Sequence, residues 1–344
     1  MQESFSLSID NATDYCKAQG LVAPKETLRI TELTGSSVSN CVLLVTTSSK
    51  QFVLKQPYKQ LLVSQEWFID RNRIWREVDW MRVLSPKLGE AIPRIVFVDK
   101  DNFICGMTYI GPNTNTWKEL LFSGQVNPKD ARNAGELLGT IHKMTSSNPG
   151  LSARFPNDHI FIQGRVSPYF DPLEETRPEL SSALATIRHR LTNNQIALVH
   201  GDFSPKNILV STRSITVIDA EICHFGDPAF DTGFLISHIL LKYIHRSDLR
   251  PKLVRIAQIF WNTYLTTFDN NLPYDQERAT CHIIGALLAA RIDGKSPAEY
   301  IISSPEKEVA RKLSGSILLE PIDNLEMLLE LAQSAVTGSQ LRCH

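Results

Sequence analysis

Acidic and amide side chains gather between short apolar runs in one segment of the chain, LVHGDFSPKNILVSTRSITVIDAEICHFGDPAFD, residues 198–231. The apolar runs predict three short strands, which place Asp202 and Asn207 in one loop and Asp219 at the end of a later strand. Acids held this close repel one another unless a cation or a proton lies between them. Phosphoryl transfer uses this inventory, because a carboxylate orients and deprotonates the attacking hydroxyl while oxygen ligands hold Mg²⁺ against nucleotide phosphates. We therefore predict Asp202 as the catalytic base, with Asn207 and Asp219 as metal ligands.

The motif HGDFSPKN followed by IDAE resembles the catalytic loop and metal motif of the aminoglycoside phosphotransferase and choline kinase group, relatives of the protein kinases. The protein-kinase pattern places its catalytic Asp five residues before its metal-binding Asn, as Asp202 and Asn207 are spaced here. Asp219-Ala220-Glu221 is similar to the Asp-x-Glu motif of methylthioribose kinases, and this resemblance implies that Glu221 assists at the metal. Ordinary loop acids and turn formers are the alternative, which the combined spacing disfavours.

Three further residues of this segment are interpreted as structural. The resemblance implies that His200, in a His-Gly-Asp motif where protein kinases have His-Arg-Asp, braces the loop by hydrogen bonding. It also implies that one of the two acids of GDPAFD, Asp227 or Asp231, ties down the backbone of the catalytic loop. The sequence leaves open which of the two does so.

A nucleotide site is expected upstream, where Lys55 lies in a predicted strand among apolar neighbours. An unpaired ammonium there is costly, so Lys55 needs an anion. In kinases the equivalent strand lysine contacts the nucleotide phosphates and pairs with a Glu on the following helix. Glu77 lies at the edge of the apolar stripe of the next predicted helix and is the predicted partner, with Glu66 as the competitor. The alternative for Lys55 is an edge-strand lysine that reaches solvent.

Two further segments are predicted to contact the nucleotide. The turn TGSSVSN has one glycine, Gly35, and offers Ser36 and Ser37 as hydrogen-bond donors to phosphate, although it is also typical of a plain hairpin turn. The segment MTYIG ends the last predicted strand of this part of the chain. In the resembling family the hinge pairs with adenine at this point, which implies that the backbone of Tyr109 and Ile110 does so here.

The sequence says less about the residues that bind the acceptor than about the catalytic and nucleotide-binding residues. Arg291 ends an apolar helix in LLAARIDGKSPAEY, and GRVSPYF places Arg165 and Tyr169 near a proline. Because Arg suits planar recognition of carboxylate or phosphate, we predict these three as substrate-binding residues, with structural ion pairs as the alternative for the arginines. Methylthioribose kinases carry paired arginines in a comparable helix where this chain has one, and Asn207 fits the aminoglycoside and choline kinase pattern better. The identity of the acceptor therefore stays open.

Hydropathy patterns place these residues on two different kinds of structure. Residues 28–110 read as antiparallel strands, and beyond them helical patterns dominate. One helix interrupts the strands, with an apolar stripe at helical spacing formed by Ile74, Val78 and Met81. We predict a bilobal, protein-kinase-like α+β fold with a small antiparallel-sheet lobe, 1–110, that binds the nucleotide. A larger helical lobe, 111–344, is predicted to carry the catalytic and substrate-binding residues.

Composition narrows the class of protein. The 344-residue chain has 36 Lys plus Arg against 37 Asp plus Glu, so no net charge favours nucleic acid or an anionic membrane surface. Its six cysteines are scattered, without a CxxC pair, as is typical of reduced thiols in a cytosolic protein. The sequence shows no secretory signal pattern and no uninterrupted run of about 18 apolar residues. We therefore expect a cytoplasmic globular protein with neither nucleic acid nor a membrane as partner.

Together these residues predict an ATP- and Mg²⁺-dependent phosphotransferase that transfers the γ-phosphate to a hydroxyl of a small molecule, such as a sugar, polyol, amino alcohol or aminoglycoside-like compound. A protein kinase is disfavoured, because GDPAFDTGF follows the metal motif almost at once and leaves no room for an activation loop. The alternative from a different class is a catalytically silent kinase-like protein that binds a nucleotide or a partner. The presence of every motif acid favours the enzyme.

Overall fold

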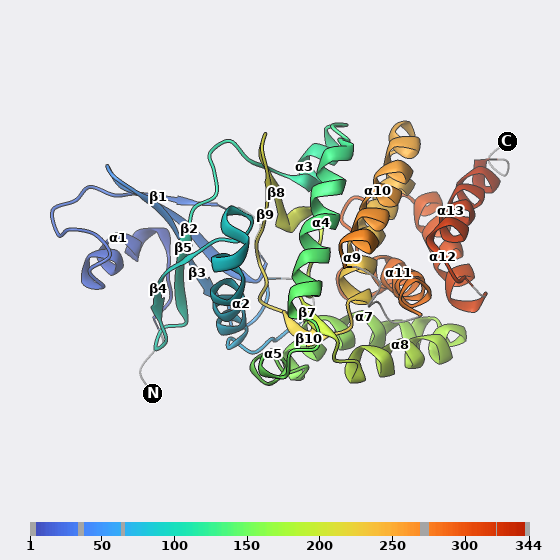
Figure 1. The fold of residues 1–344 in the computed structure, drawn as a ribbon, viewed down its shortest axis with the longest axis horizontal. Coiled ribbons are helices and arrows are strands. Elements are labelled where there is room, and N and C mark those ends of the chain that lie inside the picture. The colour runs from blue at the N-terminus through green and yellow to red at the C-terminus, as the bar shows by residue number, and fades with distance from the viewer. Residues whose placement is uncertain (1–4, 34–37, 63–65, 269–274, 321, 341–344) are drawn as a thin grey trace. The chain divides into compact units, whose positions relative to one another are not determined.

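The computed structural model describes residues 5–33, 38–62, 66–268, 275–320 and 322–340 (Figure 1). Contacts between residues divide the chain into two compact units. The first unit is formed by Met1–Thr114 together with Thr216–Glu221, and the second by Asn115–Ile215 together with Ile222–His344. The sequence patterns did not predict that residues 216–221 pack with the first unit. One contact that holds them there is the hydroxyl of Thr216, which donates to the carbonyl oxygen of Glu90 at 2.8 Å.

The described part of the first unit is built on an antiparallel sheet, as predicted. Its five strands are ordered β1-β2-β3-β5-β4. Their bounds are β1 (Arg29–Glu32), β2 (Asn40–Thr46), β3 (Gln51–Pro57), β4 (Ile95–Asp99) and β5 (Ile104–Thr108). Helix α1 (Ile9–Ala18) precedes the sheet, whereas α2 (Arg73–Leu88) and the short η1 (Gly89–Ala91) lie between β3 and β4 in the chain.

Register places Lys55 in the interior of this sheet. It pairs with Val42 of β2 on one side and with Cys105 of β5 on the other, and its exposure is only 4%. Nearly every residue of β2 and β3 is buried, so both faces of these two strands are covered. The alternative of an edge-strand lysine that reaches solvent is therefore wrong.

Helix α2 buries the predicted apolar stripe. Ile74, Val78 and Met81 are each at most 2% exposed, which confirms the helical spacing inferred from the sequence. Glu77 follows the edge of this stripe and is also 2% exposed. A carboxylate this deeply buried requires a cationic or hydrogen-bonding partner.

The described part of the second unit is mainly helical, as predicted. Its longer helices are α4 (Pro128–Thr145), α7 (Ser167–Thr176), α8 (Ser181–Asn193), α9 (Ala229–His245), α10 (Arg250–Phe268), α11 (Gln276–Asp293), α12 (Ser304–Leu319) and α13 (Leu325–Gln340). Its shorter helical segments are α3 (Trp117–Phe122), α5 (Pro149–Arg154), α6 (His159–Phe161), η2 (Ile162–Val166), η3 (Pro178–Leu180), η4 (Pro205–Asn207) and η5 (Ser247–Leu249). Among the described helices, none combines the length and the apolar character that a membrane crossing requires.

Short strands lie before and after the catalytic loop, as predicted from the apolar runs of residues 198–231. Antiparallel pairs form between β6 (Asn115–Thr116) and β8 (Ile208–Val210), and between β7 (Ala197–Val199) and β10 (His224–Gly226). Strand β9 (Ile215–Val217) leads the chain from the second unit into the first. The loop between β7 and β8 therefore starts and ends on paired strands, which restrict its backbone.

Candidate active site

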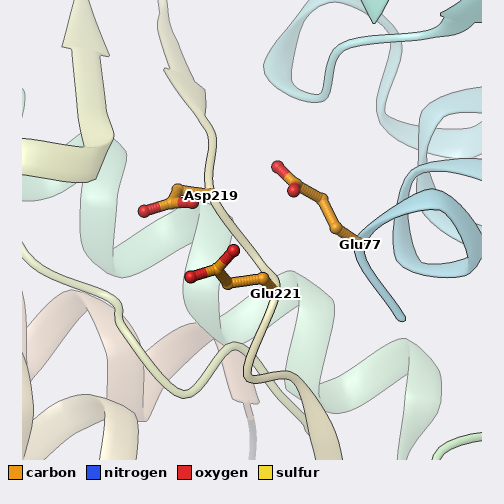
Figure 2. Close-up of side chains that lie close together, drawn as sticks. All are labelled: Glu77, Asp219 and Glu221. Carbon is orange, nitrogen blue, oxygen red and sulfur yellow. The ribbon is translucent and has the colours of Figure 1, made fainter. Parts of the chain in front are cut away.

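The ammonium of Lys55 lies among three carboxylates of the first unit. Its Nζ is 2.6 Å from Glu77 Oε2 and 2.5 Å from Asp219 Oδ1, whereas Glu221 Oε2 is 3.9 Å away. Figure 2 shows that Asp219 and Glu221 project from one segment of the chain and that Glu77 projects from another, which is α2. The expected ion pair between Lys55 and Glu77 is thus present, while the competitor Glu66 is exposed.

Glu221 is held by two residues that the sequence did not identify. Its Oε2 accepts a hydrogen bond from Asn40 Nδ2 at 3.0 Å and lies 3.3 Å from Arg73 Nε. Arg73 is fully buried, and its Nη2 donates to the carbonyl oxygens of Ser39 and Tyr58 at 2.8 and 3.1 Å. Because Arg73 is fixed on several sides, it also fixes the position of Glu221.

Asp219 has a left-handed backbone conformation, with φ of 68°. Asp tolerates this conformation better than most residues, and such positions occur where the surrounding structure demands a particular turn. The turn leaves the Asp219 side chain 24% exposed, whereas those of Glu77 and Glu221 are 3% and 8% exposed. Asp219 is therefore the most accessible of the three carboxylates.

Charge is unevenly distributed in this cluster. Burial disfavours the ammonium of Lys55, but the carboxylates of Asp219, Glu77 and Glu221 outweigh burial and raise the pKa of Lys55 well above 10.5. Burial also raises the pKa of Glu77, and although Lys55 opposes this, Asp219 and Glu221 add to it, so that the pKa reaches about 7. Lys55 thus stays charged, whereas the neighbouring carboxylates make Glu77 easier to protonate.

The predicted catalytic loop lies in the second unit, directly after β7. Gly201 has φ of 79°, and a Cβ at this position would lie 2.6 Å from the carbonyl oxygen of Ile222. Only glycine fits here, which explains why this chain has His-Gly-Asp where protein kinases have His-Arg-Asp. Nδ1 of His200 accepts a hydrogen bond from the backbone N–H of Asp202 at 3.1 Å, which confirms the bracing role inferred for His200.

Asp231, rather than Asp227, ties down the backbone of this loop. Its Oδ2 accepts from the N–H of His200 at 2.6 Å and its Oδ1 from the N–H of Gly201 at 2.9 Å. Asp227 lies instead 2.6 Å from Nε of Arg190. The structure thus decides between the two acids that the sequence left open.

A buried network supports Asp231 from behind. His142 Nε2 lies 3.3 Å from Asp231 Oδ2, and its Nδ1 is 3.1 Å from the hydroxyl of Tyr264. Burial raises the pKa of Asp231, but the hydrogen bond and charge of His142, together with His200, hold it below its usual range. Helices α4 and α10 therefore help to keep Asp231 ionised under the loop.

Two cations contact the predicted base. Asp202 Oδ2 lies 3.0 Å from Arg165 Nη2 and 2.9 Å from Lys206 Nζ. Arg165 also donates from Nε to the carbonyl oxygen of Gly201 and from Nη1 to that of Gly164, both at 2.7 Å. The structural ion pair, which was the alternative for Arg165, is therefore present. The Lys206 side chain is 51% exposed and the less constrained of the two.

Asn207 is oriented by the same loop. Its Nδ2 donates to the carbonyl oxygen of Asp202 at 3.0 Å, and its exposure is 4%. Because the amide nitrogen is engaged, the side-chain oxygen is the atom that could bind a cation.

The other two acceptor candidates differ in their surroundings. Tyr169 is 4% exposed, and its ring stacks on that of Phe234 with centroids 6.3 Å apart. Arg291 is half-buried and donates from Nη1 to the hydroxyl of Ser296 at 2.7 Å and to the carbonyl oxygen of the same residue. In the part of the chain that the structure describes, Arg291 forms no ion pair with an acid. Of the two arginines, Arg165 thus forms an ion pair with an acid, and Arg291 forms none within the described residues.

The remaining predicted nucleotide contacts fall on two segments of the first unit. Gly35, Ser36 and Ser37 lie outside the described residues. Tyr109 and Ile110 follow β5 directly and are half-buried, and the carbonyl oxygen of Ile110 accepts from the hydroxyl of Thr114 at 3.3 Å.

Comparison with known proteins identifies the family. A model described as the phosphotransferase enzyme family (APH) matches residues 30–279. The chain belongs to this family. The prediction of a kinase-like phosphotransferase is confirmed at this level.

Individual relatives of this phosphotransferase are more distant. The methylthioribose kinase of Escherichia coli O45:K1 (strain S88) is 27% identical over 263 residues, which cover 68% of this chain and 62% of the length of that protein. The methylthioribose kinase of Bacillus cereus (strain AH820) is 24% identical over 293 residues, with 77% and 74% covered.

Solved structures share the fold. Choline kinase from Cryptosporidium parvum has a TM-score of 0.53 at 11% identity and covers 97% of this chain and 95% of its own. The ethanolamine kinase of Plasmodium vivax also has a TM-score of 0.53, at 13% identity, with 95% and 86% covered. The predicted kinase-like α+β fold is therefore confirmed.

The kinase-like fold of the phosphotransferase implies a divalent metal, and the first unit offers suitable donors. Oxygen atoms of Glu77, Asp219 and Glu221 lie within 4.8 Å of one another. Carboxylate oxygens are the ligands that Mg²⁺ prefers. Lys55 contacts both Glu77 and Asp219, and Arg73 contacts Glu221, but Asp219 has the most exposed side chain of the three and is therefore the carboxylate best able to bind a cation. The residues present fit Mg²⁺.

Sequence reasoning missed several residues of the phosphotransferase that position others. Lys206 could have been found, because it lies four residues after Asp202 within the recognised motif. Arg73 carried no signal, since it begins α2 in a stretch rich in charged residues that is typical of a surface. His142 lies on the buried face of α4, where a histidine carries no special signal in the sequence. Only its contact with Asp231 shows its role.

Proposed function

We propose that this protein transfers the γ-phosphoryl group of ATP, with Mg²⁺, to a hydroxyl group of a small molecule. The observation that carries the proposal is the position of Lys55, on an interior strand, between Glu77 of α2 and Asp219. Kinases need this lysine–glutamate pair and a metal-binding aspartate together in order to hold the nucleotide phosphates. A protein that only packs its core has no use for an ammonium on an interior strand with three acids around it.

Each residue of the two groups has a role in this proposal. Lys55 binds nucleotide phosphates, and Glu77 aims its ammonium. Asp219 holds Mg²⁺, with Asn207 and Glu221 as further ligands. When bound, Mg²⁺ neutralises the charge that develops on the phosphates during transfer. The burial and the fixed partners of these side chains support the proposal, because preorganised charges need little rearrangement during the reaction.

The proposed nucleotide contacts extend to two further segments. The backbone of Tyr109 and Ile110 pairs with adenine, and Gly35, Ser36 and Ser37 donate to phosphate.

Asp202 orients the acceptor hydroxyl and receives its proton. The hydroxyl oxygen forms a bond to the γ-phosphorus, the bond from that phosphorus to the bridging oxygen breaks, and ADP leaves. The acceptor hydroxyl reaches Asp202 beside the two cations that contact its Oδ2. Lys206, whose side chain is half exposed, has room to move, whereas Arg165 is fixed by two carbonyl oxygens.

The acceptor is proposed to be a small hydroxyl compound: a sugar, polyol, amino alcohol or aminoglycoside-like molecule. Relatives in sequence are named for methylthioribose, a sugar derivative, and relatives in fold for choline and ethanolamine, which are amino alcohols. Arg291 is proposed to contact the acceptor, with Arg165 and Tyr169 as weaker candidates.

Release of ADP tests the function. The protein is incubated with ATP, Mg²⁺ and a panel of sugars, polyols, amino alcohols and phosphorylated sugars, and ATP–Mg²⁺ binding is followed in parallel by thermal shift. We expect both binding and acceptor-dependent release, with release lost in Asp202→Asn. Absence of ATP–Mg²⁺ binding would contradict the proposal, and binding without turnover, including on a metabolite extract with labelled ATP, would favour a silent kinase-like protein.

A further inference from the structure

A lysine without an acid partner lies near the end of α9 in the second unit. Lys242 is 2% exposed, and its Nζ donates to the carbonyl oxygen of His238, one turn earlier, at 3.3 Å. The rings of Phe122 and Tyr300 each have their centroid 5.3 Å from this nitrogen. Among the described residues, no carboxylate forms an ion pair with Lys242. A buried ammonium held mainly by aromatic faces is costly unless an anion joins it.

Other charges near Lys242 leave an excess of positive charge. Burial, followed by the charges of Lys118 and Arg291, lowers the pKa of Lys242 to about 7, and Glu299 opposes this. Glu299 itself is bonded to Lys118, in a pair whose side chains are 62% and 36% exposed. The positive charges of Lys242, Lys118 and Arg291 therefore outnumber the one negative charge, that of Glu299. Glu299 is already paired with Lys118 at the surface.

Unused hydrogen-bond donors accompany this charge. In the described part of the chain, Arg291 Nε and the hydroxyl of Tyr300 are buried without a hydrogen-bond partner. Burial raises the pKa of Tyr300, so its hydroxyl remains a neutral donor. Guanidinium, ammonium and phenol donors together match the oxygens of a phosphate-like group.

Contacts within the second unit connect Lys242 to the catalytic loop. Asp202 binds Arg165, whose guanidinium lies 5.5 Å from the ring centroid of Phe234. That ring is 5.1 Å from the imidazole of His238, and Lys242 donates to the carbonyl oxygen of His238. The unpaired cations therefore belong to the same part of the unit as the predicted base.

His238 reports the same positive surroundings. Burial, followed by the charges of Arg291, Lys242, Lys206 and Lys118, lowers its pKa well below 6.5. Arg291 and Lys118 therefore act on both His238 and Lys242. Lys206 is also the cation that contacts Asp202.

We propose that Lys242 and Arg291, with Lys118, bind a dianionic oxyanion group of the acceptor, so that the acceptor is a phosphate monoester with a free hydroxyl. The proposal rests on the function proposed above and names its substrate class. The excess of two positive charges matches a dianion, whereas a monocarboxylate would leave one cation unpaired. A cationic amine, such as choline or an aminoglycoside, would be repelled here. Glu299 competes with the bound group for Lys118.

This arrangement predicts a pH dependence with a definite sign. Without an anion, Lys242 loses its proton as pH rises through about 7. A bound dianion raises the pKa of Lys242, so binding above pH 7 takes up a proton and weakens as pH rises, by up to about tenfold per pH unit. Below pH 7 the affinity is flat. His238 stays neutral in this range, while His245, which pairs with Glu306 beside the same rings, is the group to control for.

Sulfate is the probe, because its charge is constant over this pH range. Isothermal titration measures sulfate binding to the full chain, to Lys242→Met and to Arg291→Met. We expect each variant to weaken binding by about tenfold or more. Glu299→Gln should strengthen binding, since it removes the competitor. Lys312→Met, a half-exposed lysine of α12, is the matched control and should change nothing.

Several outcomes would overturn the subsite. Sulfate affinity that is unchanged in both Lys242→Met and Arg291→Met, or that falls equally in Lys312→Met, contradicts it. So does a pH slope that survives Lys242→Met, or acetate binding as tight as sulfate. If sulfate responds to Lys55→Met and not to Lys242→Met, the anion binds at the nucleotide site instead. If Lys242→Met fails to fold, the opposite signs expected for Arg291→Met and Glu299→Gln still decide.

The same preparation separates this proposal from the function on which it rests. ATP–Mg²⁺ binding is measured by thermal shift for each variant. If the unmodified protein does not bind ATP–Mg²⁺, the kinase function is contradicted. The sulfate measurements still decide whether Lys242 and Arg291 bind an anion. Turnover of unphosphorylated acceptors in preference to their phosphate monoesters supports the kinase function and contradicts the subsite.

Discussion

The carboxylate of Asp202 is the residue on which turnover should depend most directly. Asp202→Asn keeps the size of the side chain but removes its capacity to accept the hydroxyl proton and its charge between Arg165 and Lys206. We expect turnover to fall by roughly 10² or more, the scale of a lost general base. ATP–Mg²⁺ binding, measured by thermal shift, should stay nearly intact. Near-normal turnover by this variant would show that another group positions the hydroxyl.

Asp219 provides the contrast to Asp202. Its side chain is the most accessible carboxylate of the Lys55 cluster. Asp219→Asn should therefore weaken nucleotide binding in the presence of Mg²⁺ and have a smaller effect when EDTA replaces the metal. Equal losses with and without Mg²⁺ would mean that Asp219 acts through Lys55 alone.

The pair formed by Lys55 and Glu77 permits a double-mutant cycle. Lys55→Ala should raise the KM for ATP or lower turnover, and Glu77→Ala should have a smaller effect in the same direction, because Asp219 still holds the ammonium. The double variant should be no worse than Lys55→Ala, which indicates coupling. Glu66→Ala is the matched control, since Glu66 is exposed. Strictly additive losses would contradict the pair.

At the scale of elements, the catalytic loop depends on Asp231 of α9. Asp231→Asn replaces an acceptor of two backbone N–H bonds by an amide whose nitrogen cannot accept, in a fully buried site. We expect a loss of stability of about 2–4 kcal/mol, seen as a lower thermal midpoint. Asp248→Asn, in an exposed ion pair with Arg246, is the control and should change little.

The pH dependence of this contribution has a known sign. Because the pKa of Asp231 is held below its usual range, its stabilising effect is present above the ordinary pKa of a carboxyl and is lost as pH falls through the lower pKa of the folded state. The difference in thermal midpoint between the protein and Asp231→Asn should therefore shrink only in strong acid. A difference that vanished near pH 6 would contradict this assignment to Asp231.

Elements with a regular pattern could be predicted from the sequence. The apolar runs of β2 and β3 and the helical stripe of Ile74, Val78 and Met81 are local patterns, so hydropathy alone reveals them. Asp202 and Asn207 could be predicted because a short motif carries them. The choice of Asp231 over Asp227 could not, since both acids stand at the start of α9 and only the direction of their side chains separates them.

At the scale of the whole molecule, contacts between distant parts of the chain escape local patterns. The return of residues 216–221 to the first unit is a tertiary contact without a local signature. Lys242 is a similar case, because one lysine in the apolar run FLISHILLKYI reads as a side chain that carries its charge to solvent. Its burial between Phe122 and Tyr300 depends on residues more than fifty positions away on either side.

The proposed roles of the two units should separate in kinetics on a substrate that turns over. Arg291→Met keeps much of the apolar stem and removes the guanidinium, so the KM for the acceptor should rise by about tenfold or more while the KM for ATP stays unchanged. Lys55→Ala should have the reverse effect. Arg255→Met, an exposed arginine of α10, is the matched control.

Because Arg291 forms no ion pair with an acid in the described part of the chain, the thermal midpoint of Arg291→Met should barely move. A lower midpoint with an unchanged KM for the acceptor would instead assign Arg291 a structural role, and its bonds to Ser296 would then be the reason it matters.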